Sequence, residues 1–260
     1  MTILDQLAEH AKERTMQTKN VEDLETIKLR AMSMPKGSFE FEKALKKQGL
    51  AFICECKRAS PSKGLIAPDY PYIEIAEDYE AAGADCISVL TEPGWFLGSD
   101  VHLKEIAERM SIPCLRKDFT VDEYMIYEAK LLGASAVLLI CSILSEKQIE
   151  KFLAVCNELG MSALVEIHNA AEALMAQNAG ARIIGVNNRS LHDFTVDADN
   201  SRKLRELIPP DVLFVSESGI ATAADVKRLY DIGADAVLIG ETLMRAQCKK
   251  AKLAELRGLL

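Results

Sequence analysis

The sequence predicts an α/β protein with a parallel sheet, and two repeating patterns support this prediction. A helical pattern, a glycine and a short apolar run follow one another four times, with glycines about 50 residues apart at Gly83, Gly133, Gly180 and Gly233. A second set of apolar runs lies midway between them, beginning at Ala51, Ile112, Ser162 and Val212. All eight runs are continuously apolar, which is typical of strands buried on both faces.

Eight strand–helix units in succession predict a (β/α)8 barrel, or TIM barrel, over residues 51–260. Each unit averages about 26 residues, enough for one strand, one helix and two loops. We expect the strands to end near Lys57, Glu92, Lys117, Cys141, Glu166, Asn188, Ser218 and Glu241. The alternative is a doubly wound open sheet, which usually carries G-x-G-x-x-G after its first strand. The chain has no such motif.

Capping signals support the helices between these strands. The four repeated glycines stand where a helix would end, because glycine adopts the left-handed C-cap conformation at little cost. Three pairs that follow strand ends have the form of a capping box, or nearly so, and predict helix starts: Thr120 with Glu123, Ser145 with Gln148, and Thr222 with Asp225.

The pattern of residues 1–50 predicts a helical extension that precedes the barrel. We expect the extension and the barrel to form one domain over residues 1–260. Apolar residues at helical spacing indicate two helices between Ile3 and Arg30, with a break near Lys19–Val21. A further short helix is expected over Phe39–Lys47. Such an extension could cover one mouth of the barrel, pack on its outside or form a dimer contact.

Composition predicts a soluble, cytoplasmic protein without a nucleic-acid or membrane partner. The 260 residues carry 39 acidic and 31 basic side chains, a net charge of −8, which disfavours nucleic acid. The N-terminus has no signal-peptide pattern, and the longest apolar-rich run, Ala134–Leu144, is far shorter than the ~20 residues of a membrane span. The seven cysteines lack a CxxC pair and indicate reduced thiols. We expect a monomer.

Charged residues stand where the strands of the barrel should end. Catalytic residues of this fold lie at that C-terminal face. Glu55 and Lys57 are two residues apart and therefore point to the same side of their strand. Together with Lys117, Glu166 and Glu217, these two residues would form either a ring of salt bridges or a cluster of lysines and glutamates suited to acid–base catalysis. We favour the catalytic interpretation, because stability does not require so many converging charges.

Glycines after the last two strands predict an anion site. Ser218–Gly219 and Gly240–Glu241 each stand between a strand and a helix, where backbone N–H groups can approach a phosphate. A small phosphorylated substrate is therefore expected. A metal is not, because the four histidines lack ligand spacing, and Cys141 is better explained as a packed thiol than as a nucleophile.

The runs at the strand ends carry a family resemblance. The most specific is residues 54–64, which contain the segment K-R-x-S-P-S; the others are residues 90–98, 115–119, 164–168, 185–191, 216–220 and 238–241. In this order they resemble the indole-3-glycerol-phosphate synthase family. The resemblance covers the whole chain, including the extension that begins at Ile3.

The resemblance implies a cofactor-independent and metal-independent lyase of tryptophan biosynthesis. Enzymes of this family close an indole ring on 1-(2-carboxyphenylamino)-1-deoxyribulose 5-phosphate, with loss of carbon dioxide and water. The resemblance assigns Lys117 as the general acid and Glu166 as the base for dehydration. It places Lys57 near the substrate carboxylate, and a proton-donor role is attributed to Lys57 as well.

Other residues would bind and orient the substrate. By resemblance, Glu55, Asn187 and Glu217 orient the lysines and the ribulose hydroxyls, while Ser60 and Arg189 contact the anthranilate end and Phe96, Phe119 and Leu191 line its ring. The phosphate would be held by Ser218, Gly219, Gly240 and the N–H of Glu241. Glu241 departs from the serine common in the family, so we expect its carboxylate to point away from the phosphate. The two cysteines of the first strand, Cys54 and Cys56, are a second departure.

Two other functions stay open at this stage. A phosphoribosylanthranilate isomerase-like or other ribulose-phosphate barrel would use the same glycines, but such an isomerase relies on a Cys and Asp pair, and here the first strand ends in Lys57. A non-catalytic phosphate-binding barrel would keep the glycines and would not need the lysines.

Overall fold

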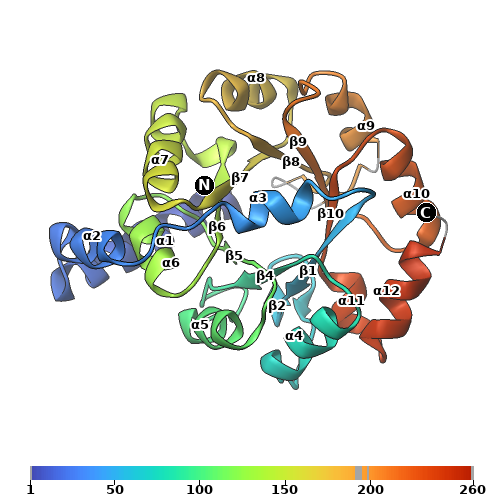
Figure 1. Ribbon diagram of the computed structural model, residues 1–260, viewed down its shortest axis with the longest axis horizontal. Coiled ribbons are helices and arrows are strands. Elements are labelled where there is room, and N and C mark those ends of the chain that lie inside the picture. The colour runs from blue at the N-terminus through green and yellow to red at the C-terminus, as the bar shows by residue number, and fades with distance from the viewer. Residues whose placement is uncertain (1, 191–194, 198, 259–260) are drawn as a thin grey trace.

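A computed structural model describes residues 2–190, 195–197 and 199–258 and confirms the (β/α)8 barrel. Its parallel strands close in the order β1-β10-β9-β8-β7-β6-β5-β4, with helices around them (Figure 1). The strands are β1 (Ala51–Cys56), β4 (Cys86–Leu90), β5 (Cys114–Lys117), β6 (Ala136–Ile140), β7 (Ser162–Ile167), β8 (Ile183–Asn187), β9 (Leu213–Glu217) and β10 (Ala236–Ile239). Each ends within two residues of its predicted position.

The helices outside the barrel follow the strands in alternation. They are α4 (Tyr72–Ala81), α5 (Asp100–Arg109), α6 (Tyr124–Leu131), α7 (Glu146–Leu159), α8 (Ala170–Asn178), α9 (Asn200–Arg205), α10 (Ala223–Asp231), α11 (Glu241–Arg245) and α12 (Lys249–Arg257), with a short 3₁₀ turn η1 (Cys141–Ile143) before α7. No helix in the described part of the chain is long and apolar enough to cross a bilayer.

The capping predictions are confirmed at two of three positions. Ser145 and Thr222 form complete capping boxes at α7 and α10, and the four repeated glycines all have positive φ. The prediction at Thr120 is wrong, because α6 begins only at Tyr124. Thr120 is buried, and Asp122 accepts the Tyr124 N–H instead.

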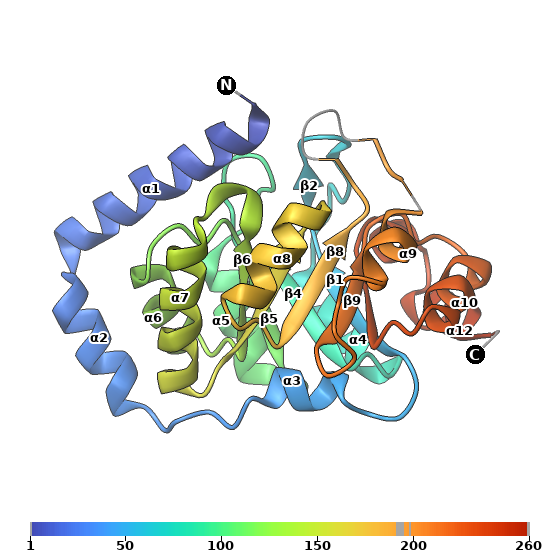
Figure 2. The same ribbon diagram turned by 90° about the horizontal axis from the view of Figure 1, so that it is seen from above.

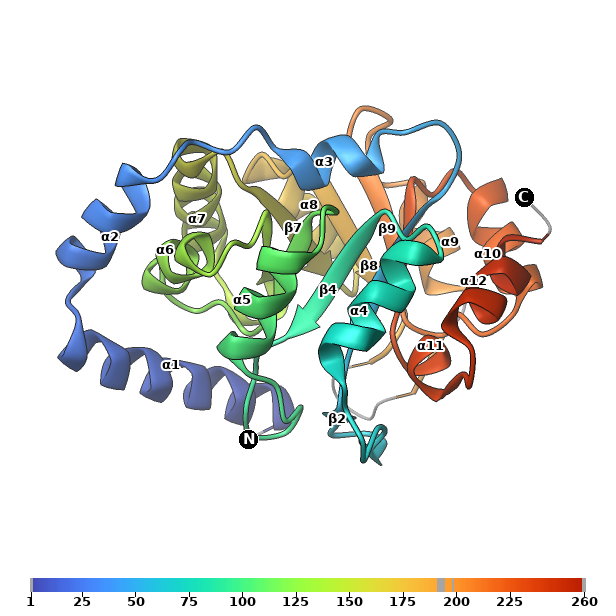
Figure 3. The ribbon, with the colours of Figure 1, turned by 60° about the horizontal axis from the view of Figure 1, so that its bottom comes forward.

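Three helices precede the barrel, as predicted: α1 (Ile3–Val21), α2 (Leu24–Ser33) and α3 (Glu40–Leu45). α1 crosses the end of the barrel where the strands terminate, α3 lies across the opposite end, and α2 runs between them (Figures 2 and 3). The extension therefore covers the C-terminal mouth with one helix and the N-terminal end with another.

Apolar side chains form two cores separated by the sheet. The outer core lies between the barrel and its helices and contains large side chains such as Tyr79 and Phe214. The inner core fills the barrel, where Leu115, Leu164 and Val215 pack together with Phe41 of α3. The interior is thus a packed core rather than an open pore.

Candidate active site

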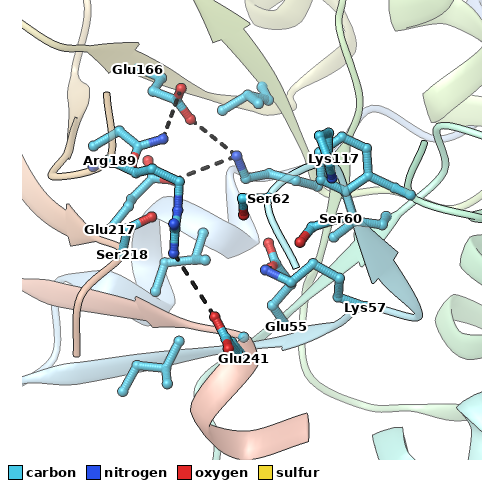
Figure 4. A pocket seen from close by; sticks show the side chains of 18 of the residues that line it. Glu55, Lys57, Ser60, Ser62, Lys117, Glu166, Arg189, Glu217, Ser218 and Glu241 are labelled. Atoms are coloured by element: carbon cyan, nitrogen blue, oxygen red, sulfur yellow. Dashed lines mark hydrogen bonds and ion pairs between the residues drawn. The ribbon is translucent and has the colours of Figure 1, made fainter. Parts of the chain in front are cut away.

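A cavity of about 420 Å³ opens at the C-terminal ends of the strands. The structure brings together there every predicted site residue that it describes (Figure 4): Glu55, Lys57, Ser60, Phe96, Lys117, Phe119, Glu166, Asn187, Arg189, Glu217, Ser218, Gly219, Gly240 and Glu241. Leu191, the remaining predicted residue, lies outside the described residues. The cavity therefore combines charged groups from the strand ends with apolar walls.

Lys117 lies between two buried carboxylates at the centre of this cavity (Figure 4). Its Nζ donates a hydrogen bond to Glu166 Oε2 at 3.0 Å and is 3.5 Å from Glu217 Oε2. Asn187 Nδ2 donates to the other oxygen of Glu166 at 3.2 Å. The three strands β5, β7 and β9 thus hold an ammonium group and two carboxylates in fixed positions.

The electrostatics of this triad keep a proton on Lys117. Burial alone would lower the pKa of Lys117, but the charges of Glu166 and Glu217 outweigh it and raise that pKa above its ordinary value. Burial alone would raise the pKa of Glu166, but the charges of Lys117 and His168 outweigh burial and bring that pKa below its ordinary value. Burial and the neighbouring Glu166 raise the pKa of Glu217 to about 8, although the charge of Lys117 opposes this rise.

A second ion pair stands beside the triad on β1. Glu55 Oε1 lies 2.7 Å from Lys57 Nζ, which confirms that the two side chains share one side of the strand. Glycines on neighbouring strands leave room for these charged groups. A Cβ atom at Gly240 would stand 2.4 Å from Glu55 Oε1, and one at Gly185 would stand 2.2 Å from Glu217 Oε1. Any larger residue at either position would displace a carboxylate of the site.

Apolar side chains form one wall of the cavity. The rings of Phe96 and Phe119 lie with their centroids 6.1 Å apart and both face the cavity. Ile3, Leu4 and Leu7 of α1 line it as well, so the extension contributes directly to the site. Such a wall suits an aromatic ring, which gains from apolar contact and offset stacking.

Backbone geometry distinguishes the opposite end of the cavity. Ser218 and Gly219 follow β9 with positive φ values of 68° and 76°. Ser218 is one of three non-glycine residues in this strained region within the described part of the chain, and its carbonyl accepts a hydrogen bond from the Asn188 side chain. Nearby, Arg189 Nη2 is 3.9 Å from Glu241 Oε2, and Arg245 Nε donates to Glu241 Oε1 at 3.0 Å.

Long-range polar contacts fix the loops of the site, and sequence reasoning missed them. Arg14 of α1 donates through two nitrogens to Asp118, the residue after Lys117. His10 of α1 contacts Glu92 at 3.0 Å, and Glu92 accepts the backbone N–H groups of residues 94–96 beside the aromatic wall. No local signal marks these partners, because more than 80 residues separate them in the chain.

Known proteins identify the family. A family model described as indole-3-glycerol phosphate synthase matches residues 4–256. The chain belongs to the indole-3-glycerol phosphate synthase family. Indole-3-glycerol phosphate synthase of Ruminiclostridium cellulolyticum is 54% identical over 257 residues, which are 98% of this chain and 99% of the relative. The enzyme of Endomicrobium trichonymphae is 51% identical over 256 residues, or 98% and 99% of the two chains.

Solved structures with lower identity share the fold. A 3-hexulose-6-phosphate synthase from Salmonella typhimurium aligns with a TM-score of 0.65 at 15% identity, over 81% of this chain and 98% of that one. A thiamine phosphate pyrophosphorylase from Pyrococcus furiosus gives a TM-score of 0.60 at 17% identity, over 84% and 96%. At these identities the likeness concerns the barrel alone.

Family membership decides between the functions that the sequence left open. The chain is an indole-3-glycerol phosphate synthase, a lyase of tryptophan biosynthesis that closes the indole ring with decarboxylation of a small phosphorylated substrate. The isomerase-like and non-catalytic alternatives are therefore set aside.

Proposed function

We propose that Lys117 is the general acid of indole ring closure in this enzyme. The reaction forms a bond between the aromatic carbon that carries the carboxylate and the ketone carbon of the ribulose chain, and the ketone oxygen then needs a proton. The position of Lys117 Nζ, 3.0 Å from Glu166 and 3.5 Å from Glu217 in a largely apolar cavity, is the observation that supports this role. An ammonium group held charged there can donate a proton directly to that oxygen.

Glu166 is the proposed base for the later dehydration. Its pKa is low while Lys117 is charged, so the carboxylate is ionised when substrate binds. The carbon–oxygen bond of the new hydroxyl breaks as water leaves, and a carbon-bound proton must move to a base. Glu166 is buried, and Asn187 orients it.

The two ends of the substrate fit opposite ends of the cavity. Lys57, paired with Glu55, is the proposed partner of the substrate carboxylate, with Ser60 as its polar neighbour at the anthranilate end. Family resemblance assigns Arg189 to that end as well, but its pairing with Glu241 favours a place at the phosphate end. Phe96 and Phe119 would pack on the aromatic ring, with Leu191 assigned to the same wall by family resemblance. The backbone around Ser218, Gly219, Gly240 and Glu241 would hold the phosphate, because these residues line the cavity and backbone N–H groups between a strand and a helix bind that anion well.

A fluorescence assay tests the proposal. The enzyme with 1-(2-carboxyphenylamino)-1-deoxyribulose 5-phosphate should develop indole fluorescence, and Glu166→Gln should bind the substrate but form product at least ~100-fold more slowly. Full turnover by Glu166→Gln would remove the role given to that carboxylate. The cytoplasmic location and the monomeric state stay predictions from the sequence, and sedimentation of the purified protein tests the latter.

A further inference from the structure

A chain of polar groups connects Glu166 to the protein surface outside the cavity. His168 follows β7 two residues after Glu166, and its Nε2 is 3.4 Å from Glu166 Oε1. Its Nδ1 lies 3.3 Å from Glu172 Oε2 on α8 and 3.2 Å from the hydroxyl of Ser142 in η1. Ser142 is exposed and donates to the other oxygen of Glu172 at 2.8 Å.

This chain is separate from the mouth through which substrate enters. Glu166 lines the cavity, but His168, Glu172 and Ser142 do not. His168 Nε2 is buried, faces Glu166 and has no hydrogen-bond partner of good geometry. The backbone N–H of His168 donates to Glu172 at 2.7 Å, and Asn200 donates to its carbonyl. The imidazole is thus fixed between an inner and an outer carboxylate.

The reaction creates a need for such a connection because it consumes a proton. Ring closure places one proton on the ketone oxygen, and the carboxylate then leaves as carbon dioxide, with its bonding electrons returned to the ring. Dehydration places a second proton on the departing hydroxyl, while one carbon-bound proton goes to the base. Two protons are donated and one is recovered, so each turnover draws one proton from solvent.

We propose that His168 relays this proton from the surface pair Glu172 and Ser142 to Glu166, and so to Lys117. The inference rests on the roles proposed above for Lys117 and Glu166. The imidazole accepts a proton at Nδ1 and releases one at Nε2, as its two distinct nitrogens allow. Once Lys117 has given up its proton, Glu166 loses its nearest positive charge and becomes a better acceptor. The relay thereby recharges the centre while substrate occupies the mouth.

The charges around His168 support this role. Burial alone would lower the pKa of His168, but hydrogen bonding to Glu172 and the charges of Glu166, Glu172 and Glu217 raise that pKa above its ordinary value. These groups approach from three different elements, β7, α8 and β9. Such surroundings favour the protonated ring, and an imidazole can exchange protons through both of its nitrogens.

Replacement of His168 and rescue by imidazole test the relay. In His168→Ala, kcat should fall by about tenfold, less than for direct loss of a general acid because protons still arrive through the open mouth after product release. KM should stay within about twofold of the wild-type value. Added imidazole should restore kcat in proportion to the concentration of its protonated form, because a freely diffusing imidazolium can replace the missing group. A purely structural role for His168 predicts no such response.

Three further variants make the outcome decisive. His102→Asn is the matched control, since His102 on α5 is also half-buried and has no contact with Glu166; its kcat should be unchanged and insensitive to imidazole. His168→Asn keeps a polar side chain and should lose activity like His168→Ala. Normal turnover by both His168 variants, or a loss that imidazole does not reverse, would overturn the relay. A turnover defect in Glu166→Gln beside normal His168 variants would reject the relay alone, whereas normal turnover by Glu166→Gln would reject the proposed base itself.

Discussion

The two ends of the barrel are built from different chemistry. At the N-terminal end, α3 presses Phe41 and Leu45 onto the apolar interior, and Asp85 and Asp235 accept backbone N–H groups of strands. At the C-terminal end, half-buried lysines and buried glutamates replace apolar side chains, and Ser218 adopts a strained backbone conformation. The N-terminal end of the barrel thus serves stability and the C-terminal end serves catalysis, as is usual for this fold. Substitutions at the two ends should therefore affect different measurements.

Lys117→Ala should give the largest effect, and it should be an effect on turnover. Loss of the general acid should lower kcat by at least ~100-fold. The midpoint of thermal unfolding should change little in comparison, because the two carboxylates left behind can take up a proton at the open mouth. Fluorescence kinetics and calorimetry on the same preparation measure both quantities. A variant with near-normal turnover would remove the role assigned to Lys117.

Leu45→Ala should show the converse behaviour at the other end. Leu45 is buried against the barrel interior. Its truncation should lower the free energy of unfolding by about 3 kcal/mol, from lost transfer energy and the cavity left behind. Below the unfolding transition, kcat and KM should match the wild type. Urea denaturation and the fluorescence assay give the two values, and a lowered kcat in fully folded protein would contradict the separation between the ends.

The sequence predicts the barrel and most of its site because both depend on local patterns. Buried parallel strands leave continuous apolar runs, and each strand ends within two residues of its expected position. Residues at those ends then converge, which is why Glu55, Lys117 and Glu166 meet in one cavity. Alternation also explains why Lys117 faces the cavity while Arg116, the residue before it, does not.

Pairings between distant segments cannot be predicted in this way. Arg116 is fully buried on the outer side of β5, where Asp100 and Glu128 neutralise it from two different helices. The contact between Arg14 and Asp118 requires that α1 cross the mouth, one of three placements compatible with the sequence. The failed capping box at Thr120 has the same origin, because tertiary burial of that side chain outweighs a local preference.

Arg14→Met should have a moderate and pH-dependent effect on stability. Burial would raise the pKa of Asp118, but Arg14 and Arg116 outweigh it and bring that pKa below its ordinary value of 3.8. Because the folded-state pKa is depressed, the stabilisation is complete above about pH 4 and is lost as pH falls through the folded-state value. At neutral pH the free energy of unfolding of the variant should therefore be about 2 kcal/mol lower than that of the wild type. This difference should shrink in acid.

Urea denaturation between pH 3 and pH 7 measures this difference. Arg182→Met is the matched control at the N-terminal end, where Arg182 pairs with Glu42 at 2.8 Å. Because Arg182 is more exposed than Arg14, its loss should be smaller at neutral pH. An equal or larger loss for Arg182→Met would show that α1 is not held to the mouth mainly by charge.

Glu241→Ser should give the smallest effect. It tests the difference between the two ends of the barrel with the loss of a single carboxylate. Glu241 lies at the proposed phosphate end, where Arg245, Arg189 and Lys63 surround its carboxylate at 3.0, 3.9 and 3.9 Å. Without that carboxylate these cations can turn toward the phosphate, and a nearby negative charge is removed. KM should therefore fall by about two- to fivefold, within the ~1 kcal/mol that partly exposed ion pairs contribute, and the gain should fade at high salt.

Glu42→Ser removes a carboxylate with two cationic partners at the other end and should leave KM unchanged. A higher KM in Glu241→Ser would mean that the carboxylate instead holds the cations in place for the phosphate.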